Sequence, residues 1–128
     1  MRYLLDTQAF LWLISDDAVA SARSRRVFLD EGSELFLSVV SLWEIGVKHS
    51  LGKLALRGSL REIISKQLRD NGIAMLPIDP EHVWRVAELP FHHRDPFDRL
   101  LAAQALCEAM AVVSGDAALD AYGVDRVW

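Results

Sequence analysis

Short apolar runs alternate with amphipathic stretches of helical period along this chain of 128 residues, and this alternation narrows the possible folds. Strands are expected at residues 2–5, 34–40, 73–78, 111–113 and, as an edge strand, 124–128. Helices are expected between them, at residues 8–13, 16–32, 41–54, 59–72, 79–89, 95–110 and 117–123. This order predicts an α/β fold with a parallel sheet of about four to five strands, covered by helices on both faces. No linker divides the chain, so residues 1–128 are expected to form a single domain.

Acidic residues lie near the ends of these expected strands. They are Asp6, Glu44, Asp98 and Asp116. The carboxyl ends of parallel strands meet at one edge of the sheet, where ligands bind, so at least three of the four side chains are expected to reach that edge. Clustered carboxylates repel each other and stay ionised only beside a positive charge. Because all the donors are oxygen atoms, the pattern favours a Mg²⁺ or Mn²⁺ site that could activate water for attack on a phosphodiester.

Each acid also has a structural explanation. Asp6 could cap the helix that follows it, and Asp98 could interact with a helix dipole. Glu44 could pair with a lysine four residues later, and Asp116 lies in a Ser-Gly-Asp turn where aspartate is common. Asp95 precedes a proline and is expected to cap a helix. The shared position near strand ends favours the functional interpretation for the first four.

Charge is distributed unevenly. Residues 46–69 contain six basic residues and one acid, whereas residues 95–128 contain six acids and two arginines. The net charge of −4 argues against binding nucleic acid through overall charge. An acidic centre beside a basic segment is typical of a metal site that handles phosphate, although a solvated helix face explains the charges equally well. Lys48, Lys53 and Arg94 are candidates for contact with nucleic-acid phosphates.

Four segments together resemble the PIN-domain ribonucleases, and in particular the VapC-like toxins of type II toxin–antitoxin pairs. The segments are LLDTQAFLW, SVVSLWEIGVKHSLGKL, HHRDPFDRLLAAQA and VVSGDAALDAYGV. They occur in the order and spacing of that family and extend over nearly the whole chain. The resemblance implies a three-layer α/β/α PIN-like fold and a Mg²⁺- or Mn²⁺-dependent endoribonuclease that cleaves RNA phosphodiesters, with transfer RNA as a family-level substrate.

The catalytic residues of that family match Asp6, Glu44, Asp98 and Asp116. We expect Asp6 and Asp98 to bind the metal directly. Asp116 is expected to join them directly or through water. Glu44 is expected to orient a metal-bound water or to hold a second ion.

Residues beside the acids are expected to support them. Thr7 matches the hydroxyl residue that follows the first acid of the family, and Ser114 stands where threonine is usual. Arg99 is expected to pair with the neighbouring acids and orient them. His92 and His93 are adjacent and belong to no zinc-binding pattern, and His93 is the histidine expected nearest the site.

Two other functions stay open. One is a different metal-dependent hydrolase acting on phosphate, such as a phosphatase. A phosphatase with an aspartyl nucleophile needs a second acid two residues after Asp6, and Gln8 stands there instead. The other is a PIN-fold binding module without catalysis, which the presence of all four acids disfavours.

The resemblance also implies partners. A cognate antitoxin is expected to pack a helix or an extended tail over residues 48–56 and the helix after them, and the chain is expected to form a homodimer. The sequence contains no apolar run long enough to span a membrane and no signal-peptide pattern. A cytoplasmic location is therefore expected.

The remaining notable residues are large apolar side chains and one thiol. Trp12, Trp43 and Trp84 lie on expected helices and are predicted to fill the core rather than to stack bases. Cys107 is predicted to be a small core residue. The role of Trp128 stays open.

Overall fold

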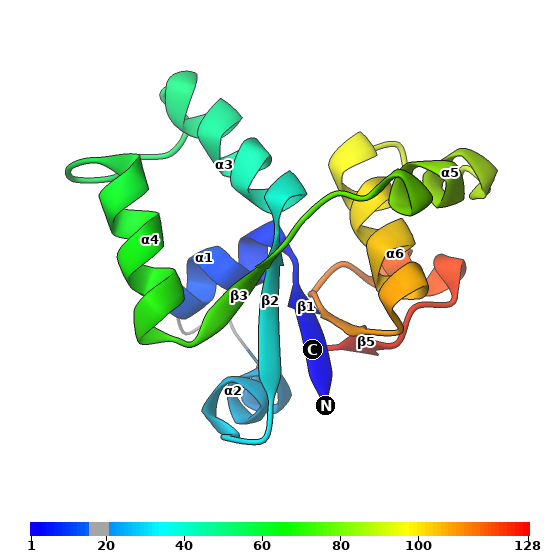
Figure 1. The fold of residues 1–128 in the computed structure, drawn as a ribbon, viewed down its shortest axis with the longest axis horizontal. Helices are drawn as coiled ribbons and strands as arrows, with labels where there is room; N and C mark the ends of the chain where they lie inside the picture. The colour runs from blue at the N-terminus through cyan, green and yellow to red at the C-terminus, as the bar shows by residue number, and fades with distance from the viewer. Residues whose placement is uncertain (16–20) are drawn as a thin grey trace.

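The computed structural model describes residues 1–15 and 21–128 (Figure 1). Its strands are β1 (Arg2–Leu5), β2 (Glu34–Ser38), β3 (Ile73–Leu76), β4 (Ala111–Val113) and β5 (Arg126–Val127). Its helices are α1 (Thr7–Ser15), α2 (Ala22–Leu29), α3 (Val39–Ser50), α4 (Leu60–Asp70), α5 (Pro80–Glu88), α6 (Pro96–Glu108) and the 3-10 helix η1 (Ala117–Tyr122). The first part of the predicted helix at 16–32, residues 16–20, lies outside the described residues.

The strands form one parallel sheet in the order β3-β2-β1-β4-β5. The predicted α/β fold with a parallel sheet is confirmed, including the edge strand at the C-terminal side. The chain leaves β1 toward β2 and β3 on one side and later returns to β4 on the other. The carboxyl ends of β1 and β4 therefore flank the switch point of the sheet, where side chains following these strands can meet over a crevice.

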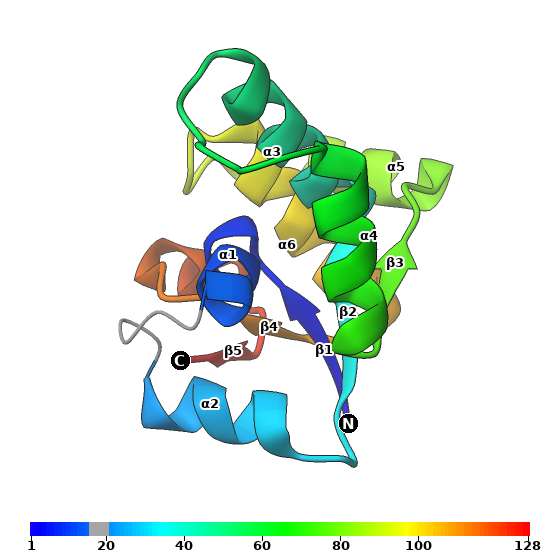
Figure 2. The same cartoon turned by 90° about the vertical axis from the view of Figure 1, so that its left-hand side faces the viewer.

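Helices cover both faces of the sheet. Helices α1, α2 and α4 lie against one face, and α5, α6 and η1 lie against the other (Figures 1 and 2). Neighbouring side chains on a strand point to opposite faces, so Leu4 belongs to the hydrophobic cluster beneath α6 while Leu5 belongs to the cluster beneath α1. Helix α3 contacts both α1 and α6 near the carboxyl end of the sheet. Within the described residues, no helix has the length and apolarity that crossing a membrane requires.

The edge strand β5 is shorter than the predicted 124–128, and the ends of β2 and β3 also differ from the prediction. Strand β2 stops at Ser38 because the Ser38 hydroxyl accepts a hydrogen bond from the backbone N–H of Val40 at 3.0 Å, which caps α3. Residues 39–40, predicted as strand, are therefore the first turn of a helix. Strand β3 ends at Leu76, directly before a proline, rather than at residue 78.

Three predictions of core residues are wrong. Trp43 and Trp84 are 60% and 61% exposed, and Cys107 is exposed on the outer face of α6. The helical period gives the spacing of apolar residues but does not fix which face of a helix meets the sheet. Trp12 is half-buried.

A network of buried hydrogen bonds connects β2, α5 and α6 near the carboxyl end of the sheet. The Ser38 hydroxyl donates to Oε1 of Gln104 at 2.5 Å, and Nε2 of Gln104 donates to the carbonyl of Pro77 at 3.2 Å. His82 is also fully buried, accepts the backbone N–H of Asp79 at Nδ1, and lies 2.9 Å from the Glu108 carboxylate through Nε2. These bonds tie β2, α5 and α6 together beneath the candidate site.

Candidate active site

Asp6 follows β1 directly and begins α1. Its Oδ1 accepts the backbone N–H of Ala9 at 2.6 Å, and its own N–H donates to the carbonyl of Val113 on β4 at 3.0 Å. The residue is only 8% exposed. Asp6 therefore caps α1, as one explanation predicted. Capping does not require burial, and burying a carboxylate is unfavourable, so its buried position at the carboxyl edge of the sheet favours a further role.

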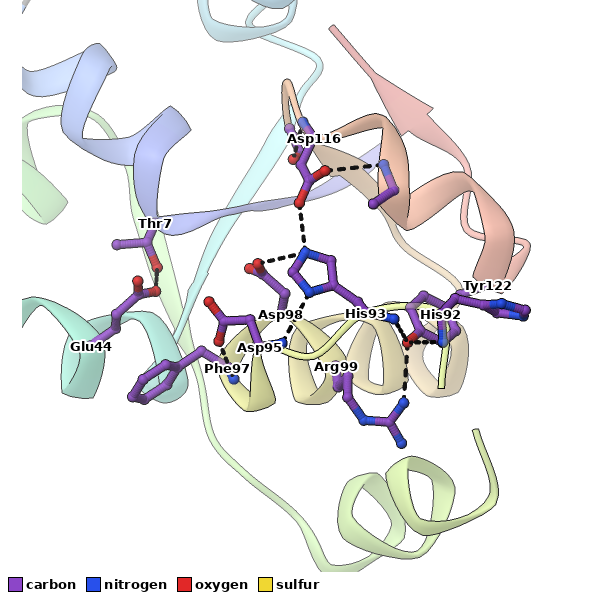
Figure 3. A network of polar contacts seen from close by, with 12 residues as sticks. Thr7, Glu44, His92, His93, Asp95, Phe97, Asp98, Arg99, Asp116 and Tyr122 are labelled. Carbon is purple, nitrogen blue, oxygen red and sulfur yellow. Dashed lines mark hydrogen bonds and ion pairs between the residues drawn. The ribbon is translucent and has the colours of Figure 1, made fainter. Parts of the chain in front are cut away.

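Glu44 reaches the same region from α3. The Thr7 hydroxyl donates to its Oε1 at 2.6 Å (Figure 3). Nζ of Lys48 pairs with its Oε2 at 3.0 Å. The predicted pairing with Lys48 is confirmed. Thr7, which follows Asp6 in the chain, connects Glu44 to the start of α1. Both oxygens of Glu44 are held in fixed directions.

Asp98 lies in the first turn of α6. The preceding Asp95 caps this helix, since its Oδ1 accepts the N–H of Phe97 at 2.9 Å. Proline at the first position of the helix suits this start. Asp95 is thereby occupied at the helix end, and Asp98, one turn further, points toward the carboxyl edge of the sheet and lies 3.3 Å from Nε2 of His93 (Figure 3).

Asp116 arrives from the turn after β4. Its backbone N–H donates to the Ser114 hydroxyl at 3.0 Å, and its Oδ1 accepts the N–H of Ala118, which caps η1. The Ser114 hydroxyl also hydrogen bonds to Asp6. Ser114 therefore links the acids that follow β1 and β4.

His93 stands between two of the acids. Its Nε2 lies 2.8 Å from Oδ2 of Asp116 and 3.3 Å from Oδ2 of Asp98, while its Nδ1 accepts the backbone N–H of Asp95 at 3.0 Å (Figure 3). Because Nδ1 is an acceptor, the ring proton lies on Nε2 and faces the carboxylates. His93 is thus arranged as a hydrogen-bond donor to the acids rather than as a metal ligand.

The charges of the acids oppose one another. Burial raises the pKa of Asp6, bonds from Ser114 and Ala9 oppose that rise, and the charges of Asp116 and Glu44 add to it. Burial, and then the charge of Asp95, raise the pKa of Asp98 from 3.8 to about 7, with Asp6 and Glu44 contributing further.

Asp116 behaves differently because it is more exposed. Burial would raise its pKa, but hydrogen bonds from His93 and from the backbone of Ala118 outweigh that effect and lower the pKa. The structure therefore brings all four predicted acids into electrostatic contact, with the negative charge least compensated at Asp6 and Asp98.

Arg99 does not pair with the acids, so its expected role is wrong. Its guanidinium turns away from them and donates to the carbonyls of Val86, Leu89 and Pro90 at 2.8–3.3 Å, and to the Tyr122 hydroxyl at 3.1 Å. It is 8% exposed and closes the C-terminal end of α5. The reason is geometric: α6 presents Arg99 to the opposite side from Asp98.

Tyr122 is a residue that the sequence did not single out. Its hydroxyl accepts the backbone N–H groups of His92 and His93 at 3.1 and 2.8 Å, in addition to the Arg99 bond (Figure 3). These bonds fix the loop that carries the His93 ring. No sequence signal beyond the AALDAYG segment could have found this contact, because it joins residues about thirty positions apart.

The predicted substrate-binding residues lie beside Glu44. Lys48, Lys53 and Arg94 line an open hollow of about 490 Å³ together with Glu44 and Asp95. Lys48 is committed to Glu44, whereas no ion pair is present for Lys53 or Arg94 among the described residues. The hollow therefore borders the acidic centre with positive charge.

The residues fit a divalent cation. The candidate ligands are carboxylate oxygens, two of the carboxyl groups have raised pKa values, and Asp98 and Asp116 each offer an oxygen within 4.8 Å of the other. A cation there would offset the effects of burial and of the neighbouring carboxylates, which together raise these pKa values. This donor chemistry suits Mg²⁺ or Mn²⁺.

A sequence model of the PIN domain matches residues 3–125, which is nearly the whole chain. The chain belongs to the PIN domain family. The expected resemblance is thereby confirmed, and the acidic edge described above is the carboxyl edge of a PIN domain sheet. No match was found among curated protein sequences.

Solved structures share this PIN fold. VapBC2 from Rickettsia felis, bound to a promoter DNA fragment, matches with a TM-score of 0.69 at 14% identity over 100% of both chains. VapBC-1 from nontypeable Haemophilus influenzae matches with a TM-score of 0.68 at 16% identity over 98% of this chain and 96% of that one. FitAcB from Neisseria gonorrhoeae matches with a TM-score of 0.65 at 19% identity over 97% and 95%. The likeness extends over whole chains, including the segments that carry the four acids.

Proposed function

We propose that this PIN domain, comprising residues 1–128, is a metal-dependent endoribonuclease and the toxin of a type II toxin–antitoxin pair. The observation that carries the proposal is the meeting of Asp6, Glu44, Asp98 and Asp116 at the switch point of the sheet. Membership of the PIN family and likeness to structures named as VapBC complexes support it.

Asp6, Asp98 and Asp116 would hold the cation, which we propose to be Mg²⁺ or Mn²⁺. When bound, such an ion supplies Lewis-acid activation of water and neutralises charge on a phosphodiester. Asp6 is fixed by Ala9 and Asp116 by Ala118, so two of the three carboxylates are already oriented before an ion arrives. This arrangement lowers the free energy needed to order the site.

Glu44 and His93 have distinct positions around these acids. Glu44 is held by Thr7 and Lys48, so a carboxylate oxygen stays in place to accept a proton or a water hydrogen bond. His93 keeps Asp116 turned toward Asp98 through its Nε2–H. Lys53 and Arg94 are available for substrate phosphates in the adjoining hollow.

The test is cleavage of structured RNAs, including transfer RNA, with Mg²⁺, Mn²⁺ or EDTA. We expect products only with metal, and we expect Asp6→Asn and Asp98→Asn to abolish them. Asp70→Asn is the matched control, since Asp70 is an exposed acid at the end of α4 and pairs with Lys66 on the same helix. Metal-dependent cleavage that survives Asp98→Asn contradicts the site assignment, and absence of cleavage of every RNA favours a binding module.

Two protein partners belong to the same proposal. A cognate antitoxin would cover the hollow of about 460 Å³ between α1, α3 and α4. The likeness to structures named VapBC2 and FitAcB supports a protein partner. A homodimer would bury the apolar surface made by Val39, Trp43 and Val47, which are 36%, 60% and 36% exposed. Light scattering of Trp43→Glu tests the dimer: a mass unchanged from the wild type would exclude this surface. We place the toxin in the cytoplasm.

A further inference from the structure

We propose that Trp12 and Trp128 form a stacking platform for one unpaired base of a single-stranded RNA, directly beside the acidic centre. The inference rests on the proposed nuclease function and adds a substrate subsite to it. An aromatic ring offers any base a flat apolar face, and such stacking is tolerant of sequence.

The two indoles border a hollow that also contains the acids. It has a volume of about 330 Å³ and is lined by Asp6, Gln8, Trp12, Gly115, Asp116 and Trp128. The ring centroids of Trp12 and Trp128 are 4.9 Å apart with their planes tilted by 45°. One wall of this hollow is therefore aromatic and another carries two of the proposed metal ligands, so a base stacked there lies next to the phosphodiester that the centre would cleave.

Trp12 is not required to fill the core. It lies half-buried on α1 and is absent from both hydrophobic clusters of the described residues, whereas Leu11, Leu13 and Trp128 pack against one of them. Gln8 is exposed one turn before Trp12 on the same side of the helix. Its amide can donate to and accept from the edge of a base that stacks on the indole.

Gly115 shows that the position of Trp128 is tightly constrained. A Cβ at Gly115 would lie 3.0 Å from Cε2 of Trp128 and 3.3 Å from Nε1 and Cζ2. The indole therefore packs on the backbone of the turn between Ser114 and Asp116. Because Gly115 has no side chain, the Trp128 ring can lie close to the neighbouring Asp116, one of the proposed metal ligands.

Positive charge continues from the platform along the surface. Gln8 and Trp12 also line the neighbouring hollow of about 460 Å³, whose other residues include Lys48 and Lys53. An aromatic surface joined to basic residues is the pattern that binds single-stranded nucleic acid, with stacking for bases and cations for phosphates. The favoured ligand is therefore unpaired RNA rather than a duplex, whose bases are already stacked.

The experiment measures KM and kcat separately for a short single-stranded RNA, with Mn²⁺. We expect Trp12→Ala to raise KM about 10- to 100-fold, in keeping with the loss of one stacked base, and Trp12→Phe to restore most of the affinity. Trp84→Ala is the control, because Trp84 is 61% exposed on α5 away from the centre. The Kd for Mn²⁺, measured by calorimetry, should be unchanged in all three variants, which separates a platform from a general loss of structure.

Three results would overturn the inference. Wild-type KM in Trp12→Ala, with cleavage intact, removes the platform and leaves the nuclease function standing. An unchanged KM combined with loss of antitoxin binding assigns the surface to a protein partner instead. If the wild type cleaves no RNA, the nuclease proposal fails, and the platform is then judged by whether short oligonucleotides quench tryptophan fluorescence less in Trp12→Ala; equal quenching would exclude it.

Discussion

Neutralising Asp98 should stabilise the metal-free protein at high pH, although it removes a proposed metal ligand. The pKa of Asp98 is raised from 3.8 to about 7 by burial and by the charges of Asp95, Asp6 and Glu44. The folded protein therefore holds a proton on Asp98 more tightly than the unfolded chain does. Above about pH 7 both states are ionised, and the folded state carries the full unfavourable energy of that charge.

The magnitude follows from the same shift. A pKa of about 7 instead of 3.8 corresponds to about 4 kcal/mol as an upper limit. The Asp98 side chain is 26% exposed, so solvent screening reduces this to about 1–2 kcal/mol. Asp98→Asn keeps the shape and should raise the Tm at about pH 8 by roughly 3–8 °C. The gain should shrink as the pH falls through 7 and vanish near pH 4, where the wild type is protonated in both states.

Thermal unfolding across this pH range, in EDTA and then in excess Mn²⁺, checks the prediction. In EDTA at about pH 8 the variant should be the more stable protein. In Mn²⁺ the order should reverse, because the wild type gains about 2.7 kcal/mol at a metal concentration 100 times Kd and the variant gains little. Asp120→Asn is the control of opposite sign, since Arg126 lowers the pKa of Asp120. A variant that is less stable than the wild type in EDTA at pH 8 would refute the reasoning.

Three further predictions concern residues that hold the site in place. Gln104→Leu should lower the free energy of unfolding by about 2–3 kcal/mol in urea titrations, because the buried Ser38 hydroxyl loses the acceptor for its proton and the Pro77 carbonyl loses a donor. Arg99→Lys should lower it by about 2 kcal/mol despite keeping the charge, since an ammonium cannot reach the separate acceptors that the guanidinium contacts. His93→Ala should weaken Mn²⁺ binding about 10-fold in calorimetry while His93→Gln, which can still donate to Asp116, weakens it less; equal loss in both variants would argue that the ring nitrogen binds the metal itself.

Most of the fold could be predicted because each strand is short, apolar and bounded by a helix. The alternation of strands and helices predicts that neighbouring strands are parallel, but it does not predict their order. In the structure β1 is central, with β2 and β3 on one side and β4 and β5 on the other. The end of β2 was missed for a local reason. Ser38 belongs to an apolar run by its neighbours, but its hydroxyl caps α3, and hydropathy carries no information about that bond.

Asp6 and Asp116 could be predicted because their positions depend on strand ends, whereas Glu44 and Asp98 lie on α3 and α6 and were matched through the family resemblance. Asp6 and Asp116 follow neighbouring parallel strands, so their proximity needs only the topology. Arg99 could not be placed in this way. Its partners are carbonyls at the end of α5 and the hydroxyl of Tyr122. Although Arg99 is next to Asp98 in sequence, its guanidinium turns away from Asp98 on a different side of α6.

The tryptophans show where periodicity stops being informative. A large apolar ring on a helix is expected in the core because of its area, yet Trp43 is exposed, and only contacts with other elements could reveal it. Gly115 was interpreted only as part of a Ser-Gly-Asp turn, although its missing side chain has another role. Its φ lies outside the left-handed region, so the backbone does not require glycine, and the missing side chain instead leaves space for Trp128. The absence of a side chain at Gly115 thus lets the Trp128 ring lie against the backbone next to Asp116, whereas at Gly46, near Glu44, no atom of the described residues outside its own helix lies within 4 Å of the Cβ position.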